Sequence, residues 1–148
     1  EKVGKPLYGT YERSLDAKGR LQLPAKLIAK EVKTLFVLRG FEGCLAVYEE
    51  DAFNRLMETL GSMDFQNEEQ RAYIRLAASS VKDLPVDAHG RVLLGKALLK
   101  DRSIGQSVTL IGVIDHFEIW DPTSYARYEI AHAGIYDNPL GTFKGYRS

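Results

Sequence analysis

Two short segments of the chain carry the same arrangement of charged residues and glycine. Residues 16–20 read Asp-Ala-Lys-Gly-Arg, and residues 87–91 read Asp-Ala-His-Gly-Arg. Arginine offers a planar fork of N–H donors that fits phosphate oxygens, or the O6 and N7 atoms of guanine in the major groove of DNA. The paired segments therefore indicate contact with nucleic acid. A structural alternative stays open, because each arginine could pair with its own aspartate and only pin the turn.

The chemistry of each residue in these segments suggests its role. The flexible ammonium of a lysine at a turn tip can reach a phosphate, although such lysines are more often simply solvated. The histidine at the equivalent position of the second segment could do the same, but it could also be an ordinary surface histidine. A carboxylate repels phosphate, so we expect the aspartates to cap the turns and orient the arginines. The candidate DNA-binding residues are Arg20, Lys18, Arg91, Arg13 and His89, and the candidate structural residues are Asp16, Gly19, Asp87 and Gly90.

The distribution of charge resolves an apparent objection to a nucleic-acid partner. The chain has 148 residues with 20 basic and 20 acidic side chains, so its formal net charge is zero, whereas DNA-binding domains are usually basic. Residues 1–30, 31–74, 75–105 and 106–148 carry net charges of +4, −5, +3 and −2. Because the sign alternates with a period of about half the chain, the charge pattern indicates an internal repeat.

The sequence contains that repeat. Residues 15–23 return as residues 86–94 at an offset of 71 positions (16 to 87), and residues 36–40 and 45–48 return as 108–112 and 117–120 at an offset of 72 (40 to 112). A unit of about 45 residues buries little apolar surface alone, so we expect the two copies to share one core.

Each copy is expected to form the same series of elements. Asp at the first position and Gly at the fourth predict a type I turn between two strands. The expected strands are 11–15, 20–23, 35–38 and one ending at Tyr48, then 82–86, 91–94, 108–111 and one ending at Trp120. The expected helices are 24–31, 50–60, 68–80, 96–102 and 122–131, and 133–148 is expected to be a flexible tail. The fold class is therefore mainly β with α (α+β).

The remaining reactive side chains do not form a catalytic or metal-binding pattern. His89, His116 and His132 are scattered, and His116 occupies the place in the second copy that Cys44 has in the first. Matching positions in two repeats indicate packing, not a Cys–His couple. We therefore expect no enzyme activity, no cofactor, no metal and no small-molecule substrate. A single cysteine and the lack of an apolar run of about 20 residues favour a cytoplasmic protein away from membranes.

The doubled motif, together with its flanking residues, resembles the MraZ family of bacterial transcriptional regulators. The supporting segments are residues 8–11, 23–26, 39–45 and 113–120, and the resemblance extends over residues 7–131. It implies two tandem AbrB/SpoVT-type swapped-hairpin repeats that form one pseudo-twofold β-barrel core with flanking helices. The implied division is 7–53 for the first repeat, 54–80 for a helical connector, 81–126 for the second repeat, and 127–148 for a helix end and the flexible tail.

The same resemblance implies a function. It predicts a sequence-specific regulator that binds double-stranded DNA at short G-rich direct repeats, controls the division and cell-wall gene cluster including its own promoter, associates with the nucleoid and assembles into a homo-oligomeric ring. Two departures are notable. Gly95 replaces the proline found at position 24, so the second short helix should begin less firmly, and His89 replaces Lys18, so the second copy is less cationic. The alternative is a ring-forming structural or protein-interaction module without specific DNA binding.

Overall fold

The computed structural model describes residues 4–141 and 143, which form eight strands and four α-helices. The first copy contains β1 (Thr10–Ser14), β2 (Arg20–Gln22), the 3-10 turn η1 (Ala25–Leu27), β3 (Thr34–Arg39), the 3-10 turn η2 (Phe41–Gly43) and β4 (Leu45–Tyr48), followed by α1 (Glu50–Gly61) and α2 (Glu68–Ser79). The second contains β5 (Lys82–Pro85), β6 (Arg91–Leu93), α3 (Lys96–Asp101), β7 (Ser107–Gly112) and β8 (Phe117–Trp120), followed by α4 (Pro122–Asp137). The α+β class is confirmed.

The strand pairing shows how the two copies interlock. Six strands form one antiparallel sheet in the order β1-β7-β8-β4-β3-β5, and β2 pairs with β6 in a separate two-stranded ribbon. The first strand of each copy thus pairs with the third strand of the other, as a swapped hairpin requires. If each strand is replaced by its equivalent in the other copy, the same strand order results, read from the opposite edge of the sheet. This symmetry indicates a pseudo-twofold axis.

Two strand pairs mark where this axis passes. In the ribbon Leu21 lies opposite Val92, and in the sheet Ala46 lies opposite Glu118. Both pairs join equivalent positions of the two copies. The strands β1 and β5 are the two edges of the sheet, and no ladder among the described strands joins them, so strand pairing does not close the sheet into a barrel.

Both copies contribute to one hydrophobic core, as the shared-core expectation requires. It lies between the inner face of the six-stranded sheet and the ribbon, and its fully buried members include Leu21, Leu35, Val92, Leu110 and Phe117. The second face of the sheet is covered by helices. Ala46 and Tyr48 face a smaller cluster with Ala52 and Leu60 of α1 and Ala77 of α2.

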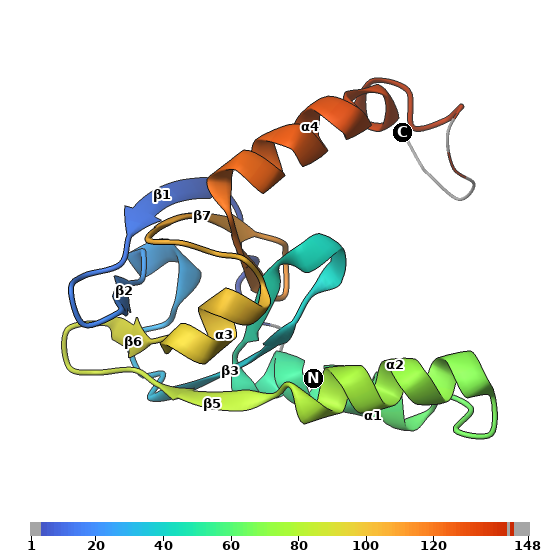
Figure 1. The fold of residues 1–148 in the computed structure, drawn as a ribbon, viewed down its shortest axis with the longest axis horizontal. Helices are drawn as coiled ribbons and strands as arrows, with labels where there is room; N and C mark the ends of the chain where they lie inside the picture. The colour runs from blue at the N-terminus through green and yellow to red at the C-terminus, as the bar shows by residue number, and fades with distance from the viewer. Residues whose placement is uncertain (1–3, 142, 144–148) are drawn as a thin grey trace.

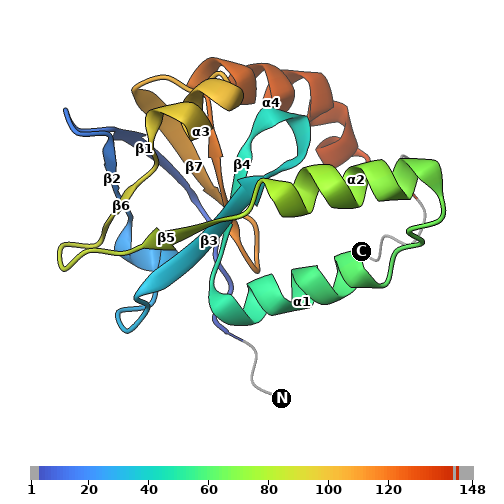
Figure 2. The same ribbon diagram turned by 60° about the horizontal axis from the view of Figure 1, so that its bottom comes forward.

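Three of the four α-helices, α1, α2 and α4, extend away from the ribbon, whereas the short α3 directly follows β6 (Figure 1). The α1–α2 hairpin runs along the opposite end of the molecule, and α4 leaves the sheet beside β7 (Figure 2). Asp121 caps α4, because its Oδ2 accepts hydrogen bonds from the backbone N and the Oγ of Ser124, and Pro122 opens the first turn. The ribbon end of the molecule is left clear of α1, α2 and α4 (Figures 1 and 2).

Within the described part of the chain, no helix has the length and apolar character needed to cross a membrane.

The sequence predicts that the second short helix begins less firmly than the first, but the structure shows the reverse. The predicted helix 24–31 is wrong: only Ala25–Leu27 forms a 3-10 turn, because Ile28 is extended (φ −146°, ψ 134°) and packs against the core on the way to β3. In the second copy α3 forms a true α-helix although it starts after Gly95. Gly95 adopts φ +80°, a conformation that favours glycine, and Leu98 and Leu99 anchor the helix in the core.

The end of the chain is more ordered than expected. The predicted helix 122–131 continues to Asp137, so residues 133–137 of the expected flexible tail are helical. Trp120 packs against Tyr125 and Tyr128 at ring-centroid distances of 5.1 and 5.2 Å, which fixes the first half of α4 on the sheet. The last part of the expected tail, residues 142 and 144–148, lies outside the described residues.

Candidate nucleic-acid interface

The first motif forms a turn that is organised by one carboxylate. Asp16 Oδ1 accepts hydrogen bonds from the backbone N–H groups of Lys18 (2.9 Å) and Arg20 (2.8 Å), while Asp16 Oδ2 accepts one from Arg20 Nε (2.7 Å). Two backbone bonds, Gly19 N to Asp16 O and Asp16 N to Arg20 O, both 2.9 Å, close the turn. Gly19 adopts φ +81°, where a side chain would be strained. The turn thus explains the spacing of Asp, Gly and Arg.

The second motif repeats this geometry. Asp87 Oδ1 accepts from the backbone N–H groups of His89 and Arg91, both at 2.9 Å, and Asp87 Oδ2 accepts from Arg91 Nε at 2.9 Å. Gly90 has φ +76° and donates its N–H to Asp87 O at 3.0 Å. In both copies the backbone N–H of the arginine holds the pKa of the aspartate below its ordinary value, assisted by the arginine side chain. Both carboxylates are therefore ionised at neutral pH.

The Asp–Arg pairs orient the guanidinium groups but leave their terminal NH₂ groups available as hydrogen-bond donors. Each aspartate engages only Nε, and within the part of the chain that the structure describes no acceptor contacts the terminal Nη atoms of Arg20 or Arg91. Both arginines stay accessible, with 32% and 26% of their side-chain surface exposed. The structural and the DNA-contacting interpretations of the motif are thus compatible, because a pinned arginine still presents two NH₂ groups to a ligand.

The two turns lie at the same end of the molecule, one at each end of the short β2–β6 ribbon (Figures 1 and 2). The strands that follow them, β2 and β6, pair with Arg20 opposite Leu93 and Gln22 opposite Arg91. Leu23 N donates to Gly90 O at 3.1 Å, and Leu94 N donates to Gly19 O at 3.4 Å, so each turn is tied to the strand of the other copy. One continuous surface, which we call the ribbon face, therefore carries both motifs.

The other predicted site residues are placed as follows. Lys18 and His89 are exposed at the two turn tips. Arg13 lies on β1, where its Nη1 donates to Glu12 O at 2.9 Å and its guanidinium lies over the Tyr11 ring at 5.9 Å. These contacts tie Arg13 to its own strand, and no described hydrogen bond or ion pair joins it to the motif turns. Of the five candidates, Arg13 therefore has the weakest structural connection to the two motif turns.

Gln22 is a ribbon-face residue that the sequence analysis missed. Its Nε2 donates to His89 O at 2.8 Å, with Gly90 O at 3.4 Å, so it fastens the second turn to the first copy's strand. Strand alternation could have identified it, because it is two positions from Arg20 and on the opposite side of the strand from the buried Leu21. Its counterpart in the second copy is Leu93, which cannot form this bond.

The reactive residues away from the ribbon face form a structural network. Cys44 is buried, and burial raises the pKa of its thiol above the ordinary value. His116 lies against the Tyr48 ring at 4.6 Å, with Nδ1 2.8 Å from Asp115 Oδ1 and Nε2 3.7 Å from Glu118 Oε2. No group of metal-ligating side chains with metal-site geometry occurs within residues 4–141 and 143.

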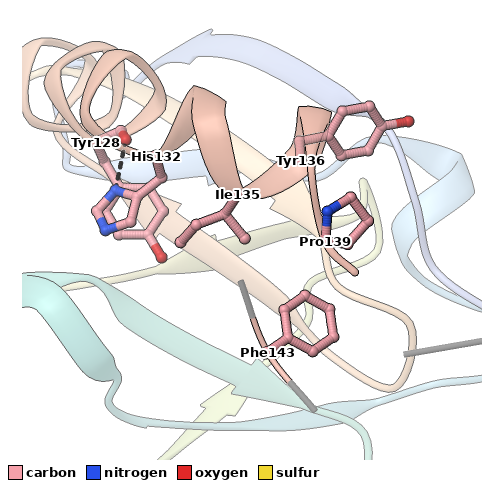
Figure 3. Close-up of a pocket in the computed structure, with 6 residues that line it drawn as sticks. All are labelled: Tyr128, His132, Ile135, Tyr136, Pro139 and Phe143. Atoms are coloured by element: carbon pink, nitrogen blue, oxygen red, sulfur yellow. Dashed lines mark hydrogen bonds between the residues drawn. The ribbon is translucent and has the colours of Figure 1, made fainter. Parts of the chain in front are cut away.

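A cavity of about 560 Å³ lies far from the motifs, between α4 and the segment that follows it. Its lining is apolar and aromatic: Tyr128 stacks on His132 at 4.1 Å, His132 Nδ1 lies 2.8 Å from Tyr128 O, and Ile135 points into the hollow (Figure 3). The other lining residues are Tyr136, Pro139 and Phe143. None of the six lining residues is a carboxylate, a lysine or an arginine, so this hollow and the cationic ribbon face are chemically unrelated.

Comparison with known protein families places the chain. The model of the family described as "MraZ protein, putative antitoxin-like" matches twice, at residues 7–76 and 79–134, in agreement with the two copies. The chain belongs to the MraZ family. The resemblance inferred from the doubled motif is thereby confirmed, and so are the two repeats.

MraZ relatives resemble the chain over most of its length. It is 35% identical to the "Transcriptional regulator MraZ" of Mycolicibacterium smegmatis over 124 residues, which is 84% of this chain and 87% of the relative. It is 34% identical to the protein of the same name from Corynebacterium diphtheriae over 137 residues, 93% of this chain and 96% of the relative. The Mesoplasma florum protein of that name is 34% identical over 123 residues, 82% of this chain and 84% of the relative. The aligned regions include nearly the whole described fold.

Proposed function

We propose that the chain is a sequence-specific, double-stranded DNA-binding transcriptional regulator and not an enzyme. The observation that carries this proposal is the pair of pinned arginines on one ribbon face. A two-stranded antiparallel ribbon fits the major groove, and arginine is the side chain that pairs bidentately with guanine O6 and N7. The relatives' name, transcriptional regulator, supports the same conclusion.

In this mechanism Arg20 and Arg91 read guanine bases. Each good bidentate contact contributes about 1–3 kcal/mol of discrimination against a wrong base. Lys18, at the tip of the first turn, holds a phosphate, while His89 at the second tip contributes less because histidine is less cationic at neutral pH. Arg13 supplies a flanking phosphate contact from β1. Asp16, Gly19, Asp87 and Gly90 keep the turns in the shape that aims the arginines.

A single subunit should bind DNA weakly, since its formal net charge is zero and its ribbon face is small. Assembly into a homo-oligomeric ring would array several ribbon faces, and linked weak contacts raise affinity by about 10²–10⁴. The family resemblance supports a cytoplasmic, nucleoid-associated regulator of the division and cell-wall gene cluster, including its own promoter, that recognises short G-rich direct repeats. Each subunit would then engage one repeat.

The decisive experiment compares two substitutions at one position. Arg20→Ala removes the guanidinium, and Arg20→Lys keeps the positive charge but loses the planar fork. We expect both variants to lose preference for G-rich direct-repeat DNA over scrambled DNA in a gel-shift assay, with Arg20→Lys retaining more non-specific binding. Arg127→Ala, which removes an exposed arginine on α4, is the matched control and should bind as the unaltered protein does. Unchanged specificity in both Arg20 variants would refute the recognition role.

The competing proposal is a ring-forming structural or protein-interaction module in which the Asp–Arg turns serve only the fold. It is favoured by the extent to which each turn is satisfied by its own hydrogen bonds. The same gel shift separates the two proposals: a scaffold would bind G-rich and scrambled duplexes equally, or neither. Light scattering of the protein alone then measures the assembly that both proposals share.

A further inference from the structure

The ribbon face carries one outward side chain whose chemistry differs from that of its neighbours. Strand alternation turns Leu21 and Val92 inward, where they are 0% and 2% exposed, and turns Arg20, Gln22, Arg91 and Leu93 outward. Leu93 is 59% exposed. Because single exposed leucines are common on protein surfaces, this exposure alone carries no argument. The argument comes from the position of Leu93.

Leu93 lies beside the first motif. It stands directly opposite Arg20 in the antiparallel register, and directly opposite residues have Cβ atoms about 4.5–5.5 Å apart. A methyl group of Leu93, Cδ1, also lies 3.9 Å from the point that a Cβ on Gly19 would occupy. Leu93 thus lies opposite the arginine that we assign to guanine and beside the turn that carries Lys18, with more than half of its surface exposed. Such cationic surroundings match a polyanion.

We propose that Leu93 is a base-reading residue that contacts the 5-methyl group of a thymine next to the guanine read by Arg20. The inference rests on the proposed function and adds a second readout to it. In the major groove the thymine methyl is the apolar feature of a base edge, and apolar side chains are the groups that contact it. Strands of a ribbon lie about 4.8 Å apart, so a side chain opposite Arg20 reaches a base close to the one that Arg20 contacts.

Only one of the two repeats can make this contact, because the residues at the equivalent position differ. At the equivalent position of the first copy stands Gln22, opposite Arg91, and its amide group is already engaged with His89 O. The ribbon therefore presents an arginine with an apolar neighbour on one half and an arginine with a polar neighbour on the other. A ribbon face of this kind reads DNA with a direction, which suits direct repeats better than palindromic half-sites.

The test removes one methyl group from the DNA. A preferred duplex is first selected from random sequences, and each thymine in it is then replaced singly by deoxyuridine, which lacks only the 5-methyl. We expect one thymine position per site at which the unaltered protein loses about 4-fold in affinity, the factor equivalent to about 0.8 kcal/mol for one buried methyl-sized group. Leu93→Ala should bind the thymine and uracil duplexes equally. Leu76→Ala, a matched control at a 55% exposed leucine of α2, should keep the difference.

Each outcome of this experiment decides the inference. If the Leu93→Ala variant still distinguishes thymine from uracil, or if no thymine position matters, Leu93 does not read a methyl group, and the proposed function stands. If Leu93→Ala alone changes the assembly mass in light scattering, Leu93 belongs to a contact between subunits. If no duplex is selected over random DNA, the proposed function itself fails. Circular dichroism of Leu93→Ala and Leu76→Ala verifies that both variants keep the fold.

Discussion

The side chain of Gln22 donates a hydrogen bond to the carbonyl oxygen of His89 at 2.8 Å, and this bond joins the strand of one repeat to the turn of the other. The reciprocal bond does not form, because Leu93 occupies the equivalent position. The second turn is therefore fastened by a side chain and a backbone bond, whereas the first is tied across the ribbon by the longer 3.4 Å bond from Leu94 N to Gly19 O. The pseudo-twofold fold is chemically asymmetric at its functional end.

Alanine substitution of the two motif glycines should reveal this asymmetry. Both glycines have positive φ, so each alanine should cost about 1–2 kcal/mol of the free energy of unfolding. A Cβ on Gly90 would also lie 3.3 Å from Gln22 Nε2, whereas a Cβ on Gly19 would meet Leu93 only at 3.9 Å. We expect Gly90→Ala to destabilise by a further 0.5–1.5 kcal/mol or so, from the weakened hydrogen bond, in urea unfolding.

The control for this prediction is a double-mutant cycle. If Gly90→Ala acts partly through Gln22, then Gln22→Ala and Gly90→Ala should be less than additive when combined. The pair Gln22→Ala and Gly19→Ala has no shared contact and should be additive. Equal costs for the two glycine variants, with additivity in both cycles, would contradict the assigned role of Gln22.

Neutralising the motif aspartate should weaken recognition while leaving the turn in place. In Asp16→Asn the amide Oδ1 can still accept from the backbone N–H groups of Lys18 and Arg20, but the side-chain NH₂ cannot accept from Arg20 Nε. The guanidinium would then be ordered only on binding. We expect specific affinity to fall about 2- to 10-fold, which corresponds to about 0.5–1.5 kcal/mol for immobilising one side chain.

The matched control for Asp16→Asn is Asp101→Asn. Asp101 also forms an ion pair, with Arg39 Nε and Nη2 at 3.1 and 3.3 Å, but this pair joins α3 to β3 and not the motif turns. Fluorescence anisotropy with the selected duplex should show no change for this variant. An equal loss of affinity in both variants would mean that general destabilisation, and not the aim of Arg20, explains the Asp16 effect.

His116 should give the fold a measurable pH dependence. Burial acts to lower the pKa of His116, but the hydrogen bonds to Glu118 and Asp115 outweigh it, so the pKa is raised above its ordinary value. A raised folded-state pKa means that protonation stabilises the native state: the contribution is fully present below the unfolded-state pKa of about 6.5 and is lost as the pH rises through the folded-state value. The difference in unfolding free energy between the unaltered protein and His116→Gln should therefore be larger at pH 6 than at pH 8.

The comparison variant for His116 is His132→Gln. His132 is exposed on α4, and its Nδ1 lies 2.8 Å from Tyr128 O with no carboxylate in the described contacts. Urea unfolding of this variant should follow the pH dependence of the unaltered protein. If His116→Gln shows no pH-dependent difference, the ion pair with Asp115 and Glu118 makes no net contribution.

The sequence predicted the parts of this molecule that depend on local chemistry. The Asp and Gly of each motif specify a turn, and alternating residues specify the strands, so the repeat and its turns could be located without a structure. The extent of the 3-10 turn and of α4 depended on tertiary contacts: Ile28 takes an extended conformation to reach the core, and Trp120 holds Tyr125 and Tyr128. Strand alternation could have placed Gln22 on the ribbon face, but its hydrogen bond could not be predicted, because the partner, His89, is 67 positions away.

The salt dependence of DNA binding should rank the two turn tips. The slope of log affinity against log salt concentration is about −0.9 per phosphate neutralised. Because Lys18 is exposed at the turn tip, two positions before Arg20, and its side chain can reach a phosphate, Lys18→Ala should make the slope less negative by about 0.9. His89→Ala should change it less, because an imidazole is a weaker cation than the ammonium of a lysine.

A charge exchange provides the matched test. His89→Lys should make the slope more negative, toward one additional phosphate contact, and Lys18→His should resemble Lys18→Ala at the same pH. These slopes are measured by anisotropy titrations from 50 to 200 mM salt, roughly the range over which phosphate contacts dominate the loss of affinity. If His89→Ala reduced the slope more than Lys18→Ala, the second turn would be the main phosphate contact. The proposed ranking of the two turn tips would then have to be reversed.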